Sequence, residues 1–279
     1  MGDEGRKGAG GADGGGKAGY RASDVRDYVQ SLYDWLNQDE GILYGSPDKA
    51  VSKVQVCWMA DVAAIRNALS IGADMIVGHE SLCYPHDVLN TGGVKDFMSW
   101  KTNHARLRLL GGADITFMRA HGTLDRFCVY DDFAGMLGLE RTFRDPKDFS
   151  RTVFDVPPIT YGEMIAKVKA ATGMARLRAT NGDRGRAVRR VGLPWGGLGL
   201  LGNCAYMQKL AALGCDLFIA GETCNYGFRF AVDAGIDMIE TGHEISENPG
   251  MRRFAETLKS ALPGLEVAFY ENLPEWDTV

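Results

Sequence analysis

The sequence has 279 residues, of which 45% are hydrophobic, and its 31 Lys and Arg against 36 Asp and Glu give a net charge of −5. This acidic balance argues against a generally basic nucleic-acid-binding protein. No apolar run approaches the ~18 residues of a membrane helix, and no apolar stretch typical of a secretory signal follows Met1. We therefore expect a cytoplasmic protein without membrane contact, its six cysteines reduced.

Residues 1–19 hold nine glycines and, apart from Met1, no apolar residue larger than alanine. Such a segment cannot offset its ordering entropy, so we expect a disordered tail. The next 121 residues, 20–140, are predicted to form an N-terminal α/β half that carries metal-ligand motifs. A basic middle segment, 141–195, follows, and 196–279 form a C-terminal α/β half that completes the site.

One unit recurs along the chain: a helix, a glycine stop, an aspartate, and a short apolar run. It ends in four places with a buried strand, at Asp74–Val77, Ile115–Met118, Leu217–Ile219 and Met238–Ile239. This is the second half of a βαβ unit. Strands that are apolar on both faces suit a mostly parallel sheet covered by helices. The sequence therefore predicts an α/β fold with two α/β halves.

Polar side chains follow each of these strands, where ligands bind in open α/β sheets. Three of the five histidines are among them, and two have a carboxylate four residues on; the residues are His79-Glu80, His121 with Asp125, Glu222, and His243-Glu244 with Glu247. Imidazole and carboxylate ligands suit Zn, Mn, Fe or Co. We expect one or two divalent ions here, because two ions can share such a set and activate a water.

The alternative is that these histidines have a structural role, because a single histidine at a strand end is most often a hydrogen-bonded structural residue. His86 and His104 lie outside the repeat and are assigned to that structural class. Glu222 is either an acid that orients a ligand histidine or an acid at a helix N-terminus. The coincidence of three histidines with two spaced carboxylates favours the metal site.

Three runs carry a resemblance to a known family: Gly72–His79, Ala120–Asp125, and Ala234–His243 with Glu247. Together they resemble the Nif-three-like dinuclear metal-centre proteins, which are also called GTP cyclohydrolase I type 2 homologues. The resemblance covers about residues 50–250. It implies an α/β fold, a two-metal site and a ring-shaped homohexamer.

Carried over motif by motif, the resemblance implies His79, Asp125, His243 and Glu247 as metal ligands. The family's first motif has two adjacent histidines and a proline, whereas this chain has Gly78 and Glu80 at the first histidine and the proline. One metal therefore loses a ligand, for which Glu80 is a substitute. A histidine that family members tend to have after the third strand is also absent, since Cys224–Gly227 stand there.

Two further motifs leave alternatives open. The run Gly197–Gly202 fits the GxGxxG pattern, which is read either as a dinucleotide site with Glu222 on the ribose or as a tight turn whose amides hold an anion. The arginines between Arg176 and Arg190 are predicted to lie on a solvated hairpin with a turn at Asn181–Asp183. Phosphate binding by these arginines stays open.

The first hypothesis is a metal-dependent hydrolase for a small polar substrate, either a nucleotide or a heterocycle, with Glu80 or Glu244 as the general base. The second is a non-catalytic metal-binding scaffold or regulatory protein. The third is an NAD-linked oxidoreductase that uses the glycine loop at 197–202.

Overall fold

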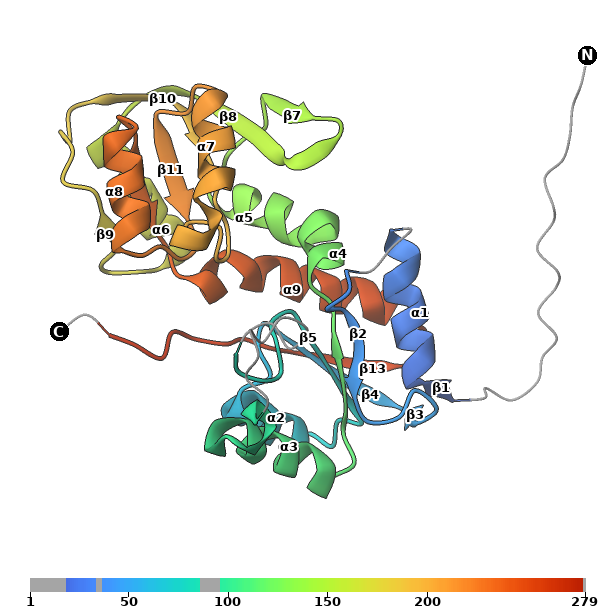
Figure 1. The fold of residues 1–279 in the computed structure, drawn as a ribbon. Coiled ribbons are helices and arrows are strands. Elements are labelled where there is room, and N and C mark those ends of the chain that lie inside the picture. Colours follow the sequence, from blue (N-terminus) through green and yellow to red (C-terminus); the bar gives the residue numbers. More distant parts are fainter. Residues whose placement is uncertain (1–18, 34–36, 86–95, 278–279) are drawn as a thin grey trace, which may run out of the picture.

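The computed structural model describes residues 19–33, 37–85 and 96–277. The predicted disordered tail lies outside these residues except for Gly19, and so does His86. Two sheets, each flanked by helices, form the two ends of the molecule (Figure 1). This arrangement confirms the predicted α/β class. The boundaries expected at residues 140 and 195 stay a prediction.

The first sheet has five strands in the order β13-β4-β5-β6-β2. β13, β4, β5 and β6 run parallel, while β2 pairs antiparallel with β6 at the edge. The strands are β2 (Gly41–Tyr44), β4 (Lys53–Cys57), β5 (Met75–Gly78), β6 (Thr116–Arg119) and β13 (Glu266–Tyr270). A short antiparallel pair of β1 (Tyr20–Arg21) and β3 (Ala50–Val51) lies beside it.

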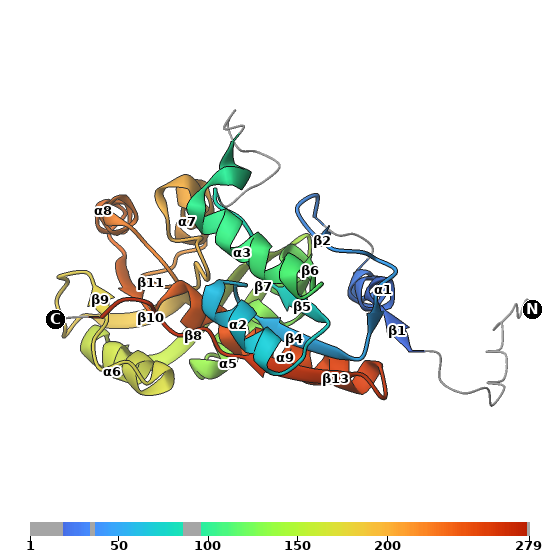
Figure 2. The same ribbon diagram turned by 90° about the horizontal axis from the view of Figure 1, so that it is seen from below.

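Helices cover both faces of the first sheet because its strands are apolar on both sides. α2 (Val62–Ser70) and α3 (Lys101–Gly112) pack on one face, with Ile76 and Phe117. On the other face, which carries Val77 and Met118, lie α1 (Ala22–Leu32) and α9 (His243–Ala261) (Figure 2). The alternation of Ile76 and Val77 between two cores follows from the two-residue period of a strand.

The second sheet has six strands in the order β7-β8-β10-β11-β12-β9. Its centre is parallel (β10, β11 and β12) and its edges are antiparallel. The strands are β7 (Phe143–Asp145), β8 (Asp148–Thr160), β9 (Arg178–Ala179), β10 (Ala187–Gly192), β11 (Leu217–Ala220) and β12 (Asp237–Glu240). The accompanying helices are α5 (Tyr130–Met136), α6 (Tyr161–Thr172), α7 (Cys204–Ala212) and α8 (Asn225–Asp233).

The predicted hairpin between Arg176 and Arg190 is wrong. β9 pairs with β12 at one edge of the second sheet, while β10 lies between β8 and β11. The arginines separate because each finds a different carboxylate: Arg178 binds Glu240, Arg186 binds Asp237, and Arg190 binds Asp155. These ion pairs distribute the basic segment along the sheet instead of gathering it on one solvated face.

All six cysteines are free thiols, and four of them are buried. In the part of the chain that the structure describes, no helix combines the length and apolar character required to cross a bilayer.

Candidate metal centre

The carboxyl ends of strands from both sheets bring the three predicted histidines together. β5 ends immediately before His79, and β6 is followed by His121 after one residue. In the second sheet, β12 is followed by Gly242 and by His243 as the first residue of α9. The imidazole rings of His79 and His121 stand 4.9 Å apart, centroid to centroid.

Helical segments place the two predicted carboxylates beside these rings. Asp125 follows the short helix α4 (Gly122–Leu124) and begins a π-helical turn that runs to Val129. Such π turns inside helices occur frequently at functional sites. Glu247 lies one turn after His243 in α9, so the two side chains share a face of that helix.

All three histidines have the same orientation. Nδ1 of His79 lies 3.1 Å from the carbonyl oxygen of Ala120, and Nδ1 of His121 lies 3.3 Å from Asp39 Oδ2. Nδ1 of His243 lies 3.0 Å from Glu222 Oε2. Since a carbonyl oxygen only accepts, Nδ1 of His79 must donate, which leaves the lone pair on Nε2. Metal-binding histidines usually have this tautomer, in which one ring nitrogen donates to an oxygen acceptor and the other is left for the metal.

The Nε2 atoms point into a group of carboxylates. Nε2 of His79 lies 3.5 Å from Asp125 Oδ1 and 3.3 Å from Glu247 Oε2. Nε2 of His243 lies 3.5 Å from Glu247 Oε1, and Nε2 of His121 lies 4.0 Å from Asp125 Oδ2. The His79 side chain is wholly buried, and apart from these two carboxylates its Nε2 has no polar partner among the residues that the structure describes.

Two sets of residues are spaced to hold an ion: His79, His121 and Asp125, and also His79, Glu80 and Glu247. An orphaned, buried imidazole nitrogen facing carboxylate oxygens fits a divalent cation, because burying it unpaired costs about 1–3 kcal/mol. The donor set of imidazoles and carboxylates matches Zn, Mn, Fe or Co. The residues present therefore fit the group that the family resemblance implies.

Two tryptophans fix the carboxylates. Nε1 of Trp195 donates a 2.8 Å hydrogen bond to Asp125 Oδ1, and Nε1 of Trp58 donates one of 2.8 Å to Glu247 Oε2. Each hydrogen bond favours one orientation of the carboxylate group that accepts it. Sequence reasoning missed both tryptophans and Asp39, because no spacing pattern links them to the histidines. The one available signal was position: Trp58 directly follows strand β4, and Trp195 comes three residues after strand β10.

The two candidate bases differ in position. Glu80 is buried at the centre, with Oε1 3.4 Å from His243 Nε2 and Oε2 3.8 Å from a guanidinium nitrogen of Arg119. Glu244 instead lines a second hollow, on the Glu222 side of His243. The structure therefore places Glu80 with the metal-ligand candidates and Glu244 apart from them. Glu222 accepts from His243, which is the geometry of an orienting acid.

Charge interactions dominate the ionisation of the centre. Burial by itself lowers the pKa of His79, but the charges of Glu247 and Asp125 outweigh it and hold that pKa well above the ordinary value. Burial likewise raises the pKa of Glu247, yet the neighbouring imidazoles bring it far below its usual range. The hydrogen bond from His243 lowers the pKa of Glu222. Glu247 and Glu222 thus stay ionised. With no cation bound, the raised pKa keeps a second proton on the His79 ring, and a cation would replace that proton on Nε2.

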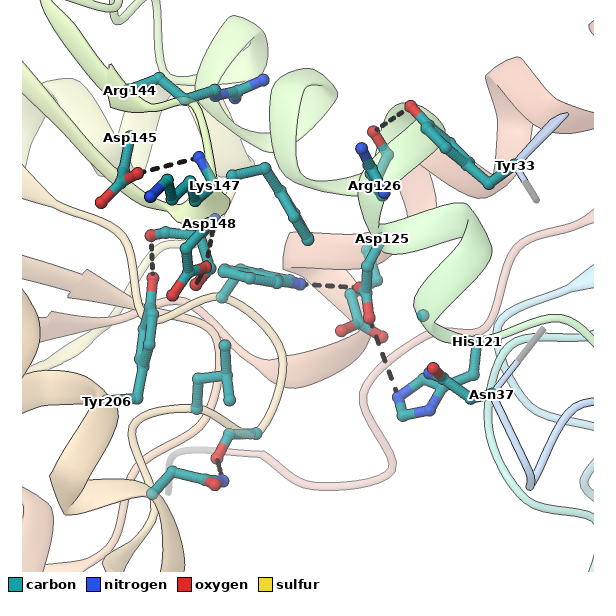
Figure 3. A pocket seen from close by; sticks show the side chains of 18 of the residues that line it. Tyr33, Asn37, His121, Asp125, Arg126, Arg144, Asp145, Lys147, Asp148 and Tyr206 are labelled. Atoms are coloured by element: carbon teal, nitrogen blue, oxygen red, sulfur yellow. Dashed lines mark hydrogen bonds and ion pairs between the residues drawn. The ribbon is translucent and has the colours of Figure 1, made fainter. Parts of the chain in front are cut away.

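A cavity of about 860 Å³ opens onto this centre. Glu80, His121, Asp125, His243 and Glu247 line its floor, and Figure 3 shows Asp125 pointing toward the ring of the neighbouring His121. The turn between β7 and β8 forms the opposite wall with Lys147, and Arg126 lies over Tyr33 at the rim. The cavity is thus acidic at the floor and carries cations at its rim.

Close packing accounts for the glycines around the centre. A Cβ on Gly78 would lie 2.8 Å from the ring of Phe117, so a histidine does not fit there without a shift of that ring. A Cβ on Gly197 would lie 3.3 Å from His243 Cε1, and one on Gly199 would lie 2.6 Å from the Glu222 carbonyl oxygen. The glycine loop at 197–202 therefore packs closely against His243, one of the metal-ligand candidates. A dinucleotide-binding role for it stays a prediction.

Comparison with known proteins identifies the family of the chain. The sequence model of Duf34/NIF3 (NGG1p interacting factor 3) matches residues 21–274. The chain belongs to the Duf34/NIF3 family. This membership confirms the resemblance drawn from the three motifs.

Curated relatives of this NIF3 protein carry the name GTP cyclohydrolase 1 type 2 homolog. The one from Clostridium perfringens is 23% identical over 231 residues, which cover 80% of this chain and 83% of the relative. The one from Neisseria meningitidis serogroup B is 26% identical, with 80% and 86% covered. A crystal structure of a Bacillus cereus protein related to NIF3 superposes with a TM-score of 0.75 at 13% identity, covering 93% and 99% of the two chains. That likeness shows the fold.

Proposed function

We propose that this NIF3 protein is a metal-dependent hydrolase for a small polar substrate. One observation carries the proposal: three imidazoles from two sheets each hold Nδ1 against an oxygen and direct Nε2 at shared carboxylates. A structural histidine needs only one hydrogen-bond partner. Three histidines whose Nε2 atoms face shared carboxylates instead match the ligand arrangement around a bound cation. His79 would hold it, either with His121 and Asp125 or with Glu80 and Glu247, and His243 adds a further Nε2 beside Glu247.

The proposal assigns one ion to His79. Both sets of residues spaced to hold an ion include His79, and its Nδ1 already faces the Ala120 carbonyl. A single Nε2 lone pair binds one ion, so the two sets are alternatives for the same ligand atom. The restriction is consistent with Gly78, which supplies no imidazole where the resembled family has its first histidine.

The remaining residues of the centre bind, orient and move protons. When bound, a divalent ion supplies a Lewis acid that polarises a carbonyl or phosphoryl oxygen and makes a water more acidic. Glu80 is the proposed proton acceptor, because it lies in the cavity with one oxygen facing His243. Trp58 and Trp195 hold the carboxylates in place. Arg126 and Lys147 would attract an anionic substrate group, such as the phosphate of a nucleotide.

The test is to purify the full chain without chelator, measure its metal content, and assay a panel of nucleotides, phosphoesters and heterocyclic amides with Zn, Mn, Fe or Co. We expect turnover that depends on the metal and disappears in His79→Ala. His104→Ala is the matched control, because His104 is exposed on α3 and remote from the cavity lining. Bound metal without turnover on any substrate would favour the metal-binding scaffold hypothesis, and no more than trace metal would contradict the proposed metal site.

We further propose that the protein works as a homo-oligomer, a hexamer by family resemblance, in the cytoplasm. Light scattering of the purified chain tests the oligomeric state.

A further inference from the structure

The side chain of Arg119 is buried next to the metal-ligand candidates. Arg119 is the last residue of β6 and precedes His121 by two positions. Its side chain is only 1% exposed. Because an arginine keeps its charge at any ordinary pH, burying one is costly unless neighbouring groups compensate the charge. The groups around this guanidinium therefore indicate what it does.

Each nitrogen of the guanidinium faces a different part of the centre. Nε donates a 3.0 Å hydrogen bond to the backbone carbonyl oxygen of His79. Nη1 donates one of 2.6 Å to Asp39 Oδ2. Nη2 lies 3.8 Å from Glu80 Oε2, an ion-pair separation, and has no hydrogen-bond partner among the described residues. Arg119 thus contacts both the backbone of one ligand candidate and the side chain of another.

The contact with Asp39 extends to His121. Asp39 Oδ2, the oxygen that accepts from Arg119, also lies 3.3 Å from Nδ1 of His121. An acceptor at Nδ1 leaves the lone pair of this imidazole on Nε2, which is the atom that faces Asp125. Arg119 is therefore connected to both histidines of one candidate ion set, to the His79 backbone directly and to the His121 ring through Asp39.

The contact with Glu80 acts on the other candidate ion set, which consists of His79, Glu80 and Glu247. The side chains of Arg119 and Glu80 are 1% and 3% exposed, so water screens their attraction little. An ion bound to a Glu80 oxygen would also lie close to a guanidinium of like charge, which repels it. Arg119 thus disfavours the set that contains Glu80 and supports the set that contains His121.

We propose that Arg119 is a positioning residue that directs the ion to His79, His121 and Asp125 and keeps Glu80 out of the ligand set. The inference rests on the proposed metal-dependent function and specifies which of the two alternative ligand sets the protein uses. It also fits the role proposed for Glu80, since a carboxylate that lines the cavity without binding the ion keeps its oxygens for proton transfer.

Cobalt(II), added to the metal-free full chain, is the probe. Each bound imidazole carries an Nδ1 proton whose NMR resonance the paramagnetic ion shifts away from the bulk of the spectrum, and the resonance missing from His121→Ala identifies His121. In wild type we expect the resonances of His79 and His121 together. In Arg119→Gln we expect the His121 resonance to disappear while that of His79 persists. A general loss of structure would remove both, so the selective loss reports positioning.

Two further variants calibrate this result. Arg119→Lys restores the charge without the planar fork of nitrogens, so the intensity of the His121 resonance should fall between those of wild type and Arg119→Gln. Arg106→Gln is the matched control, because Arg106 is also buried, lies on α3 and donates to the Leu82 carbonyl outside both ion sets. It should retain the wild-type pattern of resonances.

Competition titrations with cobalt(II) make the same comparison through the Kd. In the wild-type background, His121→Ala should weaken binding about tenfold and Glu80→Gln by about twofold or less. In the Arg119→Gln background the order of the two effects should reverse, because the ion then binds with Glu80. Such a reversal is a coupling between contacting residues, which damage to the fold alone would not produce.

An unchanged His121 resonance in Arg119→Gln, or the same order of effects in both backgrounds, would overturn the inference and leave the metal site standing. No bound cobalt in wild type would contradict the metal site itself, and the inference with it. If Arg119→Gln does not fold, Asp39→Asn provides the test at a side chain that is 23% exposed. It should reduce the effect of His121→Ala on the Kd from about tenfold to about threefold, and an undiminished effect would also overturn the inference.

Discussion

The indole N–H of Trp58 donates a 2.8 Å hydrogen bond to Oε2 of Glu247, 189 residues further along the chain. This contact joins the end of a first-sheet strand to the helix that carries His243. Nε2 of His79 faces the same oxygen at 3.3 Å. Trp58 is therefore a positioning residue: it fixes which lone pairs of Glu247 remain for a cation.

Trp58→Phe tests this role. The substitution keeps the aromatic volume and removes the donor, so Glu247 gains rotational freedom, and we expect metal affinity to fall about tenfold or more. Competition with a metal-sensitive dye gives the Kd. Trp100→Phe, at an exposed position before α3, should leave it unchanged. Equal affinity in Trp58→Phe and wild type would remove Trp58 from the centre.

His79 and His121 should differ in their effect on metal content. Both candidate ion sets contain His79, whereas only one contains His121. We therefore expect His79→Ala to reduce bound metal to trace levels and His121→Ala to retain the ion through Glu80 and Glu247 with weaker affinity. Elemental analysis after dialysis measures both. More than one ion per wild-type chain, or full metal content in His79→Ala, contradicts the single-ion proposal.

Gly78 should not accept a side chain. Because its Cβ would lie 2.8 Å from Phe117 Cε2 in the core, Gly78→Ala should lower the free energy of unfolding by about 1–3 kcal/mol. Urea denaturation measures the change. Gly135→Ala is the control, since it lies within α5 with open space at its Cβ and should gain about 0.5–1 kcal/mol. An unchanged stability in Gly78→Ala would mean that Phe117 yields freely.

Asp74 should make stability depend on pH. Burial raises its pKa, but hydrogen bonds from Ser52 and Lys53 outweigh burial and lower it below the ordinary value. A depressed pKa stabilises the fold above the unfolded value near pH 4, and this contribution is lost as pH falls through the folded pKa.

We accordingly expect Asp74→Asn to cost about 1 kcal/mol at pH 7, a figure reduced for partial solvent exposure. The difference from wild type should shrink toward pH 3. Chemical denaturation across this range is the measurement, with the exposed Asp233→Asn as the control. A difference that stays constant with pH would show that the charge of Asp74 is not involved.

The sequence predicted the fold class and the meeting of two of the histidines because both follow from local order. A helix, a glycine stop and a buried strand fix where each strand ends, and the ends of parallel strands share an edge of the sheet. His79 and His121 follow neighbouring strands of the first sheet, so their meeting could be inferred in this way. His243 follows a strand of the second sheet, and its place beside them depends on how the two halves pack, which only the family resemblance implied. The four-residue spacing of His243 and Glu247 also predicted that their side chains lie on the same face of a helix.

Other features of the site and the fold could not be predicted from the sequence, because they depend on contacts between segments that are far apart in the chain. Nothing near Trp58 or Trp195 in the sequence indicates that their indoles meet Glu247 and Asp125. The prediction of an arginine hairpin was wrong for a similar reason, since Ala179 of β9 pairs with Ile239 of β12, 60 residues later. Glu244 sits beside a ligand candidate in the sequence, yet its side chain faces another hollow.

The pairing of β13 with β4 has a consequence for biosynthesis. Val267 and Val54 are partners in the first sheet, so that sheet lacks an edge until more than two hundred further residues have been translated. The helix that bears His243 and Glu247 precedes β13 by only a few residues. On the ribosome, the early part of the chain must wait for both, so completion of the first sheet and assembly of the ion-binding pocket both depend on the synthesis of residues 243–270.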